Sequence, residues 1–201
     1  MTTQRFGAEL AQRPGATILP FHGKTPRIHD TAFIAPGVRI IGDVEIGPDA
    51  SIWYNCVLRG DVNRIVIGAR SNIQDGTVIH CDGPEAHEPH GFPTTIGDDV
   101  LVGHLAMLHG CTLHDRAFVG LSATVMNGCV IESDGMLAAG AMLSPGKTIG
   151  ARQLWMGRPA KYARDLPDEA LVDMQAGVAR YVENGRAHLA AIADAGGEAG
   201  V

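Results

Sequence analysis

The chain has 201 residues, of which 45% are hydrophobic and 5% aromatic, and its formal net charge at pH 7 is −6. This length suits one sizeable domain, and a negative charge without a basic cluster argues against nucleic acid as a partner. Because no apolar run reaches membrane length and the N-terminus lacks a signal-peptide pattern, we expect a cytoplasmic protein with no membrane partner.

Residues 1–27 contain Pro14, Pro20 and Pro26, and we expect them to form an irregular N-terminal cap. From residue 28 onward an aliphatic residue recurs at nearly every sixth position. The repeat slips by three residues at 64–66, is interrupted by a loop at about 81–95, and drops one residue before 113. Its aliphatic positions are Ile28, Ile34, Ile40, Ile46, Ile52, Leu58, Ile67, Ile73, Ile79, Ile96, Val102, Leu108, Leu113, Val119, Val125, Ile131, Leu137 and Leu143.

A period of six over residues 28–150 is typical of a parallel β-helix of hexapeptide repeats, an all-β fold in which each hexad forms one flat face. Three faces complete one coil, so this segment predicts about six coils. Residues eighteen apart, once the insertions are corrected, then lie directly above one another. Cys56 and Cys129 occupy the small fifth position of their hexads, where we expect buried packing groups rather than a disulfide framework.

After the coil we expect a connector at 151–165 and then an α-helix at 166–194. Pro167 followed by Asp168 and Glu169 is typical of a helix start, because Pro suits the first position and acids suit the positive end. Residues 195–201 read AGGEAGV and are expected to form a flexible tail. The apolar residues that recur at helical spacing are Leu171, Met174, Val178 and Val182.

Three of the nine histidines share a register. His80 and His109 are the second residues of hexads that share a face, so we expect them one coil apart at about 4.8 Å, where two imidazoles can chelate a tetrahedral ion. His104 is the third residue of a hexad on the preceding face and cannot easily turn the corner to join the pair in its own chain. In a trimer with threefold symmetry, its face can lie against the pair of a neighbouring subunit. With that assumption, the register predicts a three-histidine site with an open fourth position. The alternative is three stacked or surface histidines.

The same register brings other polar groups toward this site. Arg59 lies on the face of the stacked histidine pair, and Asp75 lies one coil from the third histidine, so we expect Arg59 and Asp75 to pair across the subunit interface. This pair is either part of the site or a plain salt bridge. Gln74 either positions a nucleophile by hydrogen bonding or belongs to a stacked polar ladder. Asp61 and Asn72 stay open between turn chemistry and a place in the site.

These residues resemble the motifs of γ-class carbonic anhydrases, in order and spacing, over roughly residues 20–185. The resemblance implies a left-handed parallel β-helix, a homotrimer, and metal sites between subunits. It implies an enzyme, a lyase that hydrates carbon dioxide reversibly to bicarbonate with a metal-bound hydroxide. The matching blocks are Arg59-Gly60-Asp61, Asn72-Ile73-Gln74-Asp75, His80, Gly103-His104 and His109-Gly110-Cys111.

By this resemblance, His80, His104 and His109 are the metal ligands, with His104 supplied by the neighbouring subunit. Zn²⁺ is the expected metal, although three imidazoles suit Co²⁺ or Fe²⁺ as well. The roles implied for the remaining residues are an intersubunit pair for Arg59 and Asp75, orientation of the hydroxide by Gln74, and a place near the active site for Tyr181.

Two features depart from the family pattern. The prototype enzymes carry a glutamate just after the Arg-Gly-Asp-like block, where this chain has Val62. They also carry a long acidic loop with a proton-transferring glutamate, whereas the loop at 81–95 is shorter. The candidates for a proton relay in this loop are Glu85, His87, Glu88 and His90.

Two rival functions remain open at the level of the sequence. An acyltransferase of the same hexapeptide architecture would use one histidine as a general base toward an acyl thioester and would hold no stoichiometric metal. A trimeric scaffold or small-ligand binder would keep the metal site with little or no turnover, and Val62 and the short loop fit that function.

Overall fold

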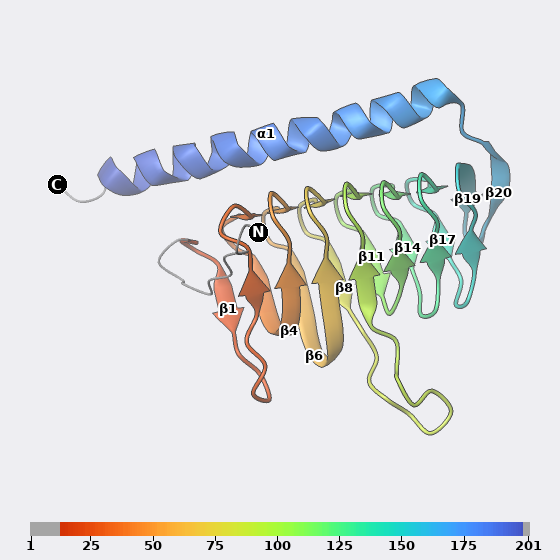
Figure 1. Cartoon of the computed structure of the whole chain (residues 1–201), viewed down its shortest axis with the longest axis horizontal. Helices are drawn as coiled ribbons and strands as arrows, with labels where there is room; N and C mark the ends of the chain where they lie inside the picture. Colours follow the sequence, from red (N-terminus) through yellow and green to blue (C-terminus); the bar gives the residue numbers. More distant parts are fainter. Residues whose placement is uncertain (1–12, 199–201) are drawn as a thin grey trace, which may run out of the picture.

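The computed structural model describes residues 13–198 of the chain. These residues form a stack of three-sided coils, and one long helix, α1 (Asp168–Glu198), lies along the stack (Figure 1). The fold expected from the hexad repeat and, for its left hand, from the family resemblance is confirmed: an all-β left-handed parallel β-helix with a C-terminal α-helix. Within the described residues, no helix combines the length and the apolar character needed to span a membrane.

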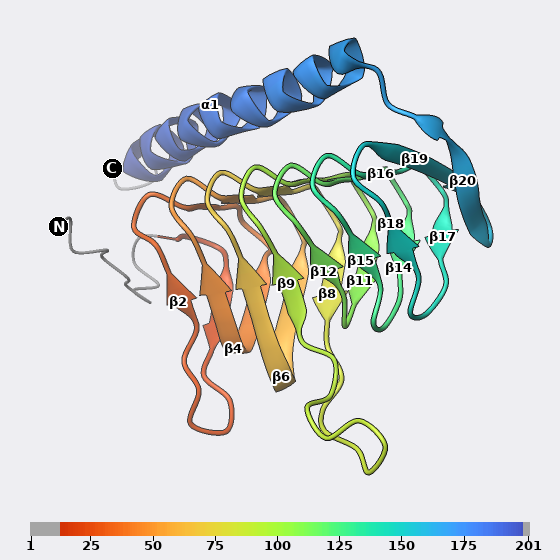
Figure 2. The same ribbon diagram turned by 45° about the vertical axis from the view of Figure 1, so that its right-hand side comes forward.

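Three columns of parallel strands form the faces of the prism (Figure 2). The face that contacts α1, here called the helix face, comprises β3 (Phe33–Ile34), β5 (Ser51–Ile52), β7 (Asn72–Ile73), β10 (Leu101–Val102), β13 (Phe118–Val119), β16 (Met136–Leu137) and β19 (Gln153–Gly157). The second, here called the histidine face, comprises β1 (Thr17–Leu19), the first parts of β4 (Arg39–Ile46) and β6 (Val57–Ile67), β8 (Val78–His80), β11 (Met107–His109), β14 (Thr124–Val125) and β17 (Met142–Leu143). The third comprises β2 (Arg27–Ile28), the last parts of β4 and β6, β9 (Thr94–Ile96), β12 (Thr112–Leu113), β15 (Val130–Ile131) and β18 (Thr148–Ile149).

The strand pairing confirms the register expected from the period of six. Leu58, Ile79 and Leu108 pair in consecutive coils of the histidine face, and Ile73 pairs with Val102 in the helix face. The aliphatic residue that starts each hexad points into the prism and is at most 3% exposed. Since burial of each such side chain contributes roughly 1.5–3 kcal/mol, the repeat itself holds the coils together.

The coil extends beyond the expected range of 28–150 at both ends. The segment expected to be an irregular cap contributes β1, which pairs with β4, while residues 1–12 lie outside the described part. The expected connector forms β19, which continues the helix face, and β20 (Ala160–Asp165), which pairs with β19 in antiparallel orientation. The hexad count places Trp155, an aromatic residue, in line with Leu137, so the aliphatic pattern ends before the coil does.

The C-terminal helix also differs from its expected bounds of 166–194. It begins at Asp168, directly after Pro167, whose carbonyl accepts a hydrogen bond from the Ala170 amide at 3.1 Å. It continues to Glu198, so much of the expected tail at 195–201 is helical, and residues 199–201 lie outside the described part. The two glycines at 196 and 197 suggested a tail, but they lie within the helix.

The insertion expected at 81–95 leaves the prism as a narrow hairpin (Figure 1). Backbone hydrogen bonds join Asp82 to Phe92 near its base and Glu85 to Glu88 near its tip. The insertion ends earlier than expected, because Thr94 already begins β9 and its hydroxyl donates to the His80 carbonyl at 2.6 Å.

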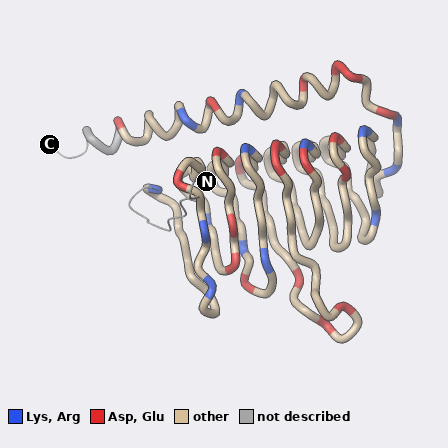
Figure 3. Tube along the Cα trace, in the orientation of Figure 1, with Lys and Arg blue, Asp and Glu red and all other residues tan. Residues whose placement is uncertain are grey.

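Acidic and basic residues alternate along the corner of the coil nearest α1 (Figure 3). Ion pairs join neighbouring coils there, with 2.6 Å between Arg70 and Asp99 and 2.8 Å between Arg116 and Asp134. A left-handed backbone costs a non-glycine residue about 1–2 kcal/mol, and these pairs help to offset that cost. This charged corner consists of residues with φ between 55° and 62°, namely Asp49, Arg70, Asp99, Arg116, Asp134 and Arg152.

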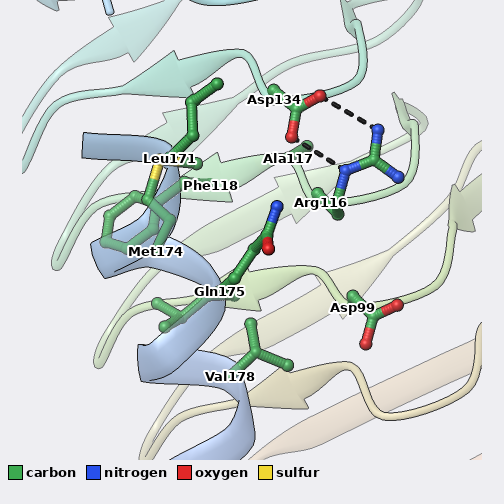
Figure 4. Close-up of a pocket in the computed structure, with 10 residues that line it drawn as sticks. Asp99, Arg116, Ala117, Phe118, Asp134, Leu171, Met174, Gln175 and Val178 are labelled. Atoms are coloured by element: carbon green, nitrogen blue, oxygen red, sulfur yellow. Dashed lines mark hydrogen bonds and ion pairs between the residues drawn. The ribbon is translucent and has the colours of Figure 1, made fainter. Parts of the chain in front are cut away.

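α1 packs on the coil through apolar side chains near its start. Leu171, Met174 and Val178 line a small pocket together with Phe118 of β13 (Figure 4). Ion pairs also tie the helix to the charged corner, between Arg152 and Asp168 at its start and between Arg186 and Asp49 farther along.

Candidate metal centre

His80 ends β8 and His109 ends β11, and the two side chains lie next to each other on the histidine face. Leu108 pairs with Ile79, which puts His109 in register with His80. His80 Nδ1 lies 3.0 Å from His109 Nε2, and the ring centroids are 4.9 Å apart. The stacking of this pair, expected from the hexad register, is therefore present.

An oxygen acceptor holds the outer nitrogen of each ring. His80 Nε2 lies 2.9 Å from Asp61 Oδ1, and His109 Nδ1 lies 2.6 Å from Asn127 Oδ1. Because a carboxylate and an amide oxygen only accept hydrogen bonds, each outer nitrogen is a donor. When each ring carries a single hydrogen, the two inner nitrogens, His80 Nδ1 and His109 Nε2, present lone pairs to each other.

This arrangement fits a metal ion. Two nitrogens 3.0 Å apart need a shared proton or metal ion between their lone pairs. A tetrahedral ion with bonds of 2.0–2.1 Å separates two ligand nitrogens by about 3.3 Å, so a small opening of the pair would admit one. Metal-binding histidines ordinarily donate the second N–H to a carboxylate or carbonyl oxygen, as both rings do here. These imidazole donors therefore suit a divalent first-row transition metal such as Zn²⁺.

Asp61 joins Arg59 to the histidine pair. Arg59 Nη1 donates to Asp61 Oδ2 at 2.6 Å, on the side opposite His80. Burial by itself raises the pKa of Asp61, but hydrogen bonds from Arg59 and His80 outweigh it and hold the pKa below its ordinary value. The carboxyl group therefore stays ionised and keeps accepting from His80. Within one chain Arg59 contacts Asp61 rather than its expected intersubunit partner, Asp75.

His104, the third expected ligand, lies on the helix face just after β10. Its Nδ1 lies 2.8 Å from Asp75 Oδ2, which leaves Nε2 as the nitrogen that can bind a metal. Across residues 13–198, no three histidine, cysteine, aspartate or glutamate side chains are grouped to hold a metal. One chain thus brings two of the expected ligands together and keeps the third on another face.

Gln74 and Asn72 lie at β7 and are almost fully buried, with 5% and 0% exposure. Gln74 Nε2 donates to Asn72 Oδ1 at 3.2 Å, so Gln74 Oε1 is left as an acceptor. Among the described residues, nothing accepts a hydrogen bond from the buried Asn72 Nδ2. Such an unpaired donor costs about 1–3 kcal/mol, so Asn72 is held in place against a local penalty.

Tyr181 reaches the helix face from α1. Its ring packs edge-on against Trp53, with 5.4 Å between the ring centroids. Burial, and then the negative charge of Asp75, raises the pKa of Tyr181 above its ordinary value. The phenol therefore stays protonated at neutral pH, close enough to Asp75 to be affected by its charge.

The four expected proton-relay residues lie on the protruding hairpin. His87 Nδ1 is 3.5 Å from Glu85 Oε2, and both side chains are largely exposed. Glu88 and His90 follow on the same hairpin. The base of the hairpin lies near the histidine pair, because Asp82 Oδ1 is 4.0 Å from His109 Nε2.

Sequence reasoning missed two residues of this centre, Asn127 and Asp82. The pairing of Leu108 with Val125 places Asn127 one coil from Gly110, the residue after a ligand. A polar residue one coil beyond a ligand is the signal that could have found Asn127. Asp82 belongs to the insertion, where the period of six carries no positional information.

Comparisons with known proteins agree with this architecture. The family model described as "Bacterial transferase hexapeptide (six repeats)" matches residues 25–60. Gamma carbonic anhydrase 2, mitochondrial, of Arabidopsis thaliana is 42% identical over 172 residues, which cover 86% of this chain and 62% of that protein. The chain thus spans less than two thirds of the length of that relative. The carbonic anhydrase of Geobacillus kaustophilus is 40% identical over 173 residues, which cover 86% of this chain and 91% of that protein.

Solved structures show the same fold. The crystal structure of a hexapeptide transferase family protein from Anaplasma phagocytophilum is 44% identical, with a TM-score of 0.79, and covers 85% of this chain and 97% of that one. Acyltransferases at 13–14% identity share the fold alone. For assigning the chain to a family, relatives at about 40% identity over most of the chain therefore carry more weight than these distant structures.

Proposed function

Because the chain belongs to the γ-class carbonic anhydrase family, we propose that it catalyses the reversible hydration of carbon dioxide to bicarbonate. The observation that carries the proposal is the histidine pair. The inner nitrogens of His80 and His109 face each other at 3.0 Å, and Asp61 and Asn127 accept hydrogen bonds from the outer nitrogens. An acyltransferase would need only one such histidine, as general base.

The proposed ligands are His80, His109 and His104, the last from a neighbouring subunit of a homotrimer. Zn²⁺ is the proposed metal, and Co²⁺ or Fe²⁺ suits the same donors. Such an ion would supply a nucleophile at neutral pH, because it lowers the pKa of a bound water to about 7. Support for an intersubunit site comes from His104, which Asp75 orients on a different face of the coil.

The remaining residues are proposed to position the metal ligands and the attacking group and to keep other water out of the centre. Asp61 keeps the hydrogen on His80 Nε2, while Arg59 keeps Asp61 ionised and faces the subunit boundary proposed for Asp75. Gln74 Oε1, whose amide nitrogen donates to Asn72, is proposed to accept a hydrogen bond from the O–H of the attacking group. Asn72, through its amide oxygen, holds Gln74 in this orientation.

Tyr181 and the hairpin complete the proposed centre. Tyr181 covers Trp53 on the helix face. Its raised pKa keeps the phenol protonated at neutral pH. Hydration releases a proton, and we assign its transfer to the hairpin residues Glu85, His87, Glu88 and His90 as a group. Val62, whose side chain is 51% exposed, cannot accept that proton. A cytoplasmic location stays a prediction.

The test measures the rate of carbon dioxide hydration by protein that is purified anaerobically and loaded with Zn²⁺, Co²⁺ or Fe²⁺. Stopped-flow measurement should show a rate above buffer that is proportional to bound metal. His109→Ala should lower kcat/KM by more than about 100-fold, because it removes a ligand of the ion that supplies the nucleophile.

His114→Ala is the matched control, since His114 lies on the third face and pairs with Glu132 at 3.8 Å. It should keep the wild-type rate. Equal rates for His109→Ala and the wild type would reject the assignment. Stoichiometric metal without hydration would indicate a metal-binding scaffold instead, and no bound metal would favour acyl transfer.

A further inference from the structure

We infer that Asn127 and Asp82 form a hydrogen-bonded link that positions His109 for metal binding and connects the base of the hairpin at 82–92 to the centre. This inference rests on the proposed metal site. It assigns a role to two residues that approach that site from opposite directions, Asn127 from the next coil and Asp82 from the insertion.

The link begins at the outer nitrogen of His109. Asn127 Oδ1 lies 2.6 Å from His109 Nδ1, the shortest contact that either ring of the histidine pair makes. An amide has two different ends, and only its oxygen can accept from an imidazole N–H. If the amide turned over, its NH₂ would face His109, and the ring would have to present a lone pair at Nδ1 and its hydrogen at Nε2. That tautomer cannot bind a metal through Nε2.

Asp82 determines which end of the amide faces His109. Asn127 Nδ2 donates to Asp82 Oδ2, and an ionised carboxylate accepts hydrogen bonds only. Turning the amide over would bring two acceptors, Asn127 Oδ1 and the Asp82 carboxylate, against each other. Asp82 therefore holds Asn127 in the orientation that keeps His109 Nε2 as a metal-binding lone pair.

The hairpin base holds Asp82 itself. Backbone hydrogen bonds of 3.0 and 2.9 Å join Asp82 and Phe92, and Asn63 Nδ2 donates to the Asp82 carbonyl at 2.8 Å. Space around the link is tight: a Cβ atom on Gly110 would lie 2.7 Å from Asn127 Oδ1 and 2.5 Å from Phe92 Cβ. The hairpin base thus sets the position of Asp82, and through Asn127 the orientation of His109.

Metal affinity is the direct readout. We expect Asn127→Leu, which is close in size but neither donates nor accepts, to weaken Co²⁺ or Zn²⁺ binding by about 10–100-fold in competition with a chromophoric chelator at fixed pH. In the metal-free protein, ¹⁵N chemical shifts of His109 should show loss of the Nδ1–H tautomer.

A reciprocal swap separates positioning from folding. Asn127→Asp alone sets two carboxylates against each other and should also weaken binding. Adding Asp82→Asn restores a donor opposite the new acceptor, so the double variant should return to within about threefold of the wild-type affinity, as a coupled pair requires. Asp82→Asn alone lets the Asn127 amide turn over and should weaken binding as well, whereas Glu132→Gln on the third face is the control that should stay near wild type.

The outcomes discriminate between this link and the proposed function. Wild-type metal binding with unchanged affinity and tautomer in Asn127→Leu overturns the link and leaves the proposed function standing. A swap that fails to recover affinity although the protein folds also overturns the link. Failure of the wild-type protein to bind metal overturns the proposed function, and the link with it.

Discussion

Burial controls the chemistry of the four cysteine thiols, all of which lie in the core. It raises the pKa of Cys56 and Cys111 to about 12 and that of Cys81 to about 11, and it raises the pKa of Cys129 as well. Since the thiolate is the reactive form, these residues act as small packing groups. This agrees with the packing role expected for Cys56 and Cys129.

The thiols should therefore be unreactive in the folded protein. At pH 8, we expect Ellman's reagent to modify them at least about 100-fold more slowly than free cysteine. Unfolded thiols ionise near the ordinary pKa of 9.0, so in urea all four should react, and faster at pH 10 than at pH 8. Rapid modification of any thiol under native conditions would show that the coil opens there.

At the scale of the element, α1 depends on contacts made along its whole length. Its start packs by apolar residues (Figure 4), whereas farther along His188 Nδ1 lies 2.9 Å from the Tyr54 hydroxyl. The His188 ring also lies edge-on to Trp53, at 5.0 Å between centroids. Tyr181, two turns before His188, shares that contact with Trp53, so this anchor holds Tyr181 over the helix face.

Removing the anchor should loosen one part of the helix and leave the coil intact. Tyr54→Phe deletes a hydrogen bond of about 1 kcal/mol, so amide exchange at 181–192 should become about fivefold faster. Hydrogen exchange with mass spectrometry measures this directly. Tyr162→Phe, which removes a hydroxyl from a 51% exposed tyrosine on β20, is the matched control and should change nothing in that segment. Faster exchange throughout the coil would argue against a local anchor.

At the scale of the whole molecule, the three proposed ligands do not meet within one chain. The histidine pair lies on the histidine face, and His104 lies on the helix face with Asp75. Two faces that meet at a corner point away from each other, so a second copy must supply the third ligand if the site is to close. A cyclic trimer repeats that contact three times with one interface.

Subunit mixing tests this directly. Chains with His104→Ala keep the histidine pair, and chains with His109→Ala keep His104, so each alone should lack complete sites. In a mixed trimer, one of the three interfaces joins the two intact halves. Random mixing in equal amounts should therefore restore about one quarter of the wild-type tight metal sites.

Unfolding and refolding the two variants together, with elemental analysis of separated trimers, measures the recovery. Variants refolded separately and then combined without exchange are the control and should stay empty. No recovery in confirmed mixed trimers would mean that all three histidines act within one chain or do not act together.

Much of the fold follows from the sequence because a β-helix converts residue number into position. The period of six predicted the inward residues, the register of Ile79 with Leu108, and thus the stacking of His80 on His109. The pattern is local and is repeated in every coil, so errors at one hexad do not propagate. It failed at β1 and β19, where a single short strand or an aromatic inward residue interrupts the aliphatic signal.

Residue type and register thus determined, from the sequence alone, which side chains share a face. Only the tertiary structure decided which atoms meet within one chain: that Arg59 donates to Asp61, that Asn127 contacts His109, and that Asp82 contacts Asn127. The physical reason is that rotamers and insertion paths have no period. A hexad count places a Cα atom within one coil, whereas hydrogen bonds depend on side-chain directions that the surrounding packing selects.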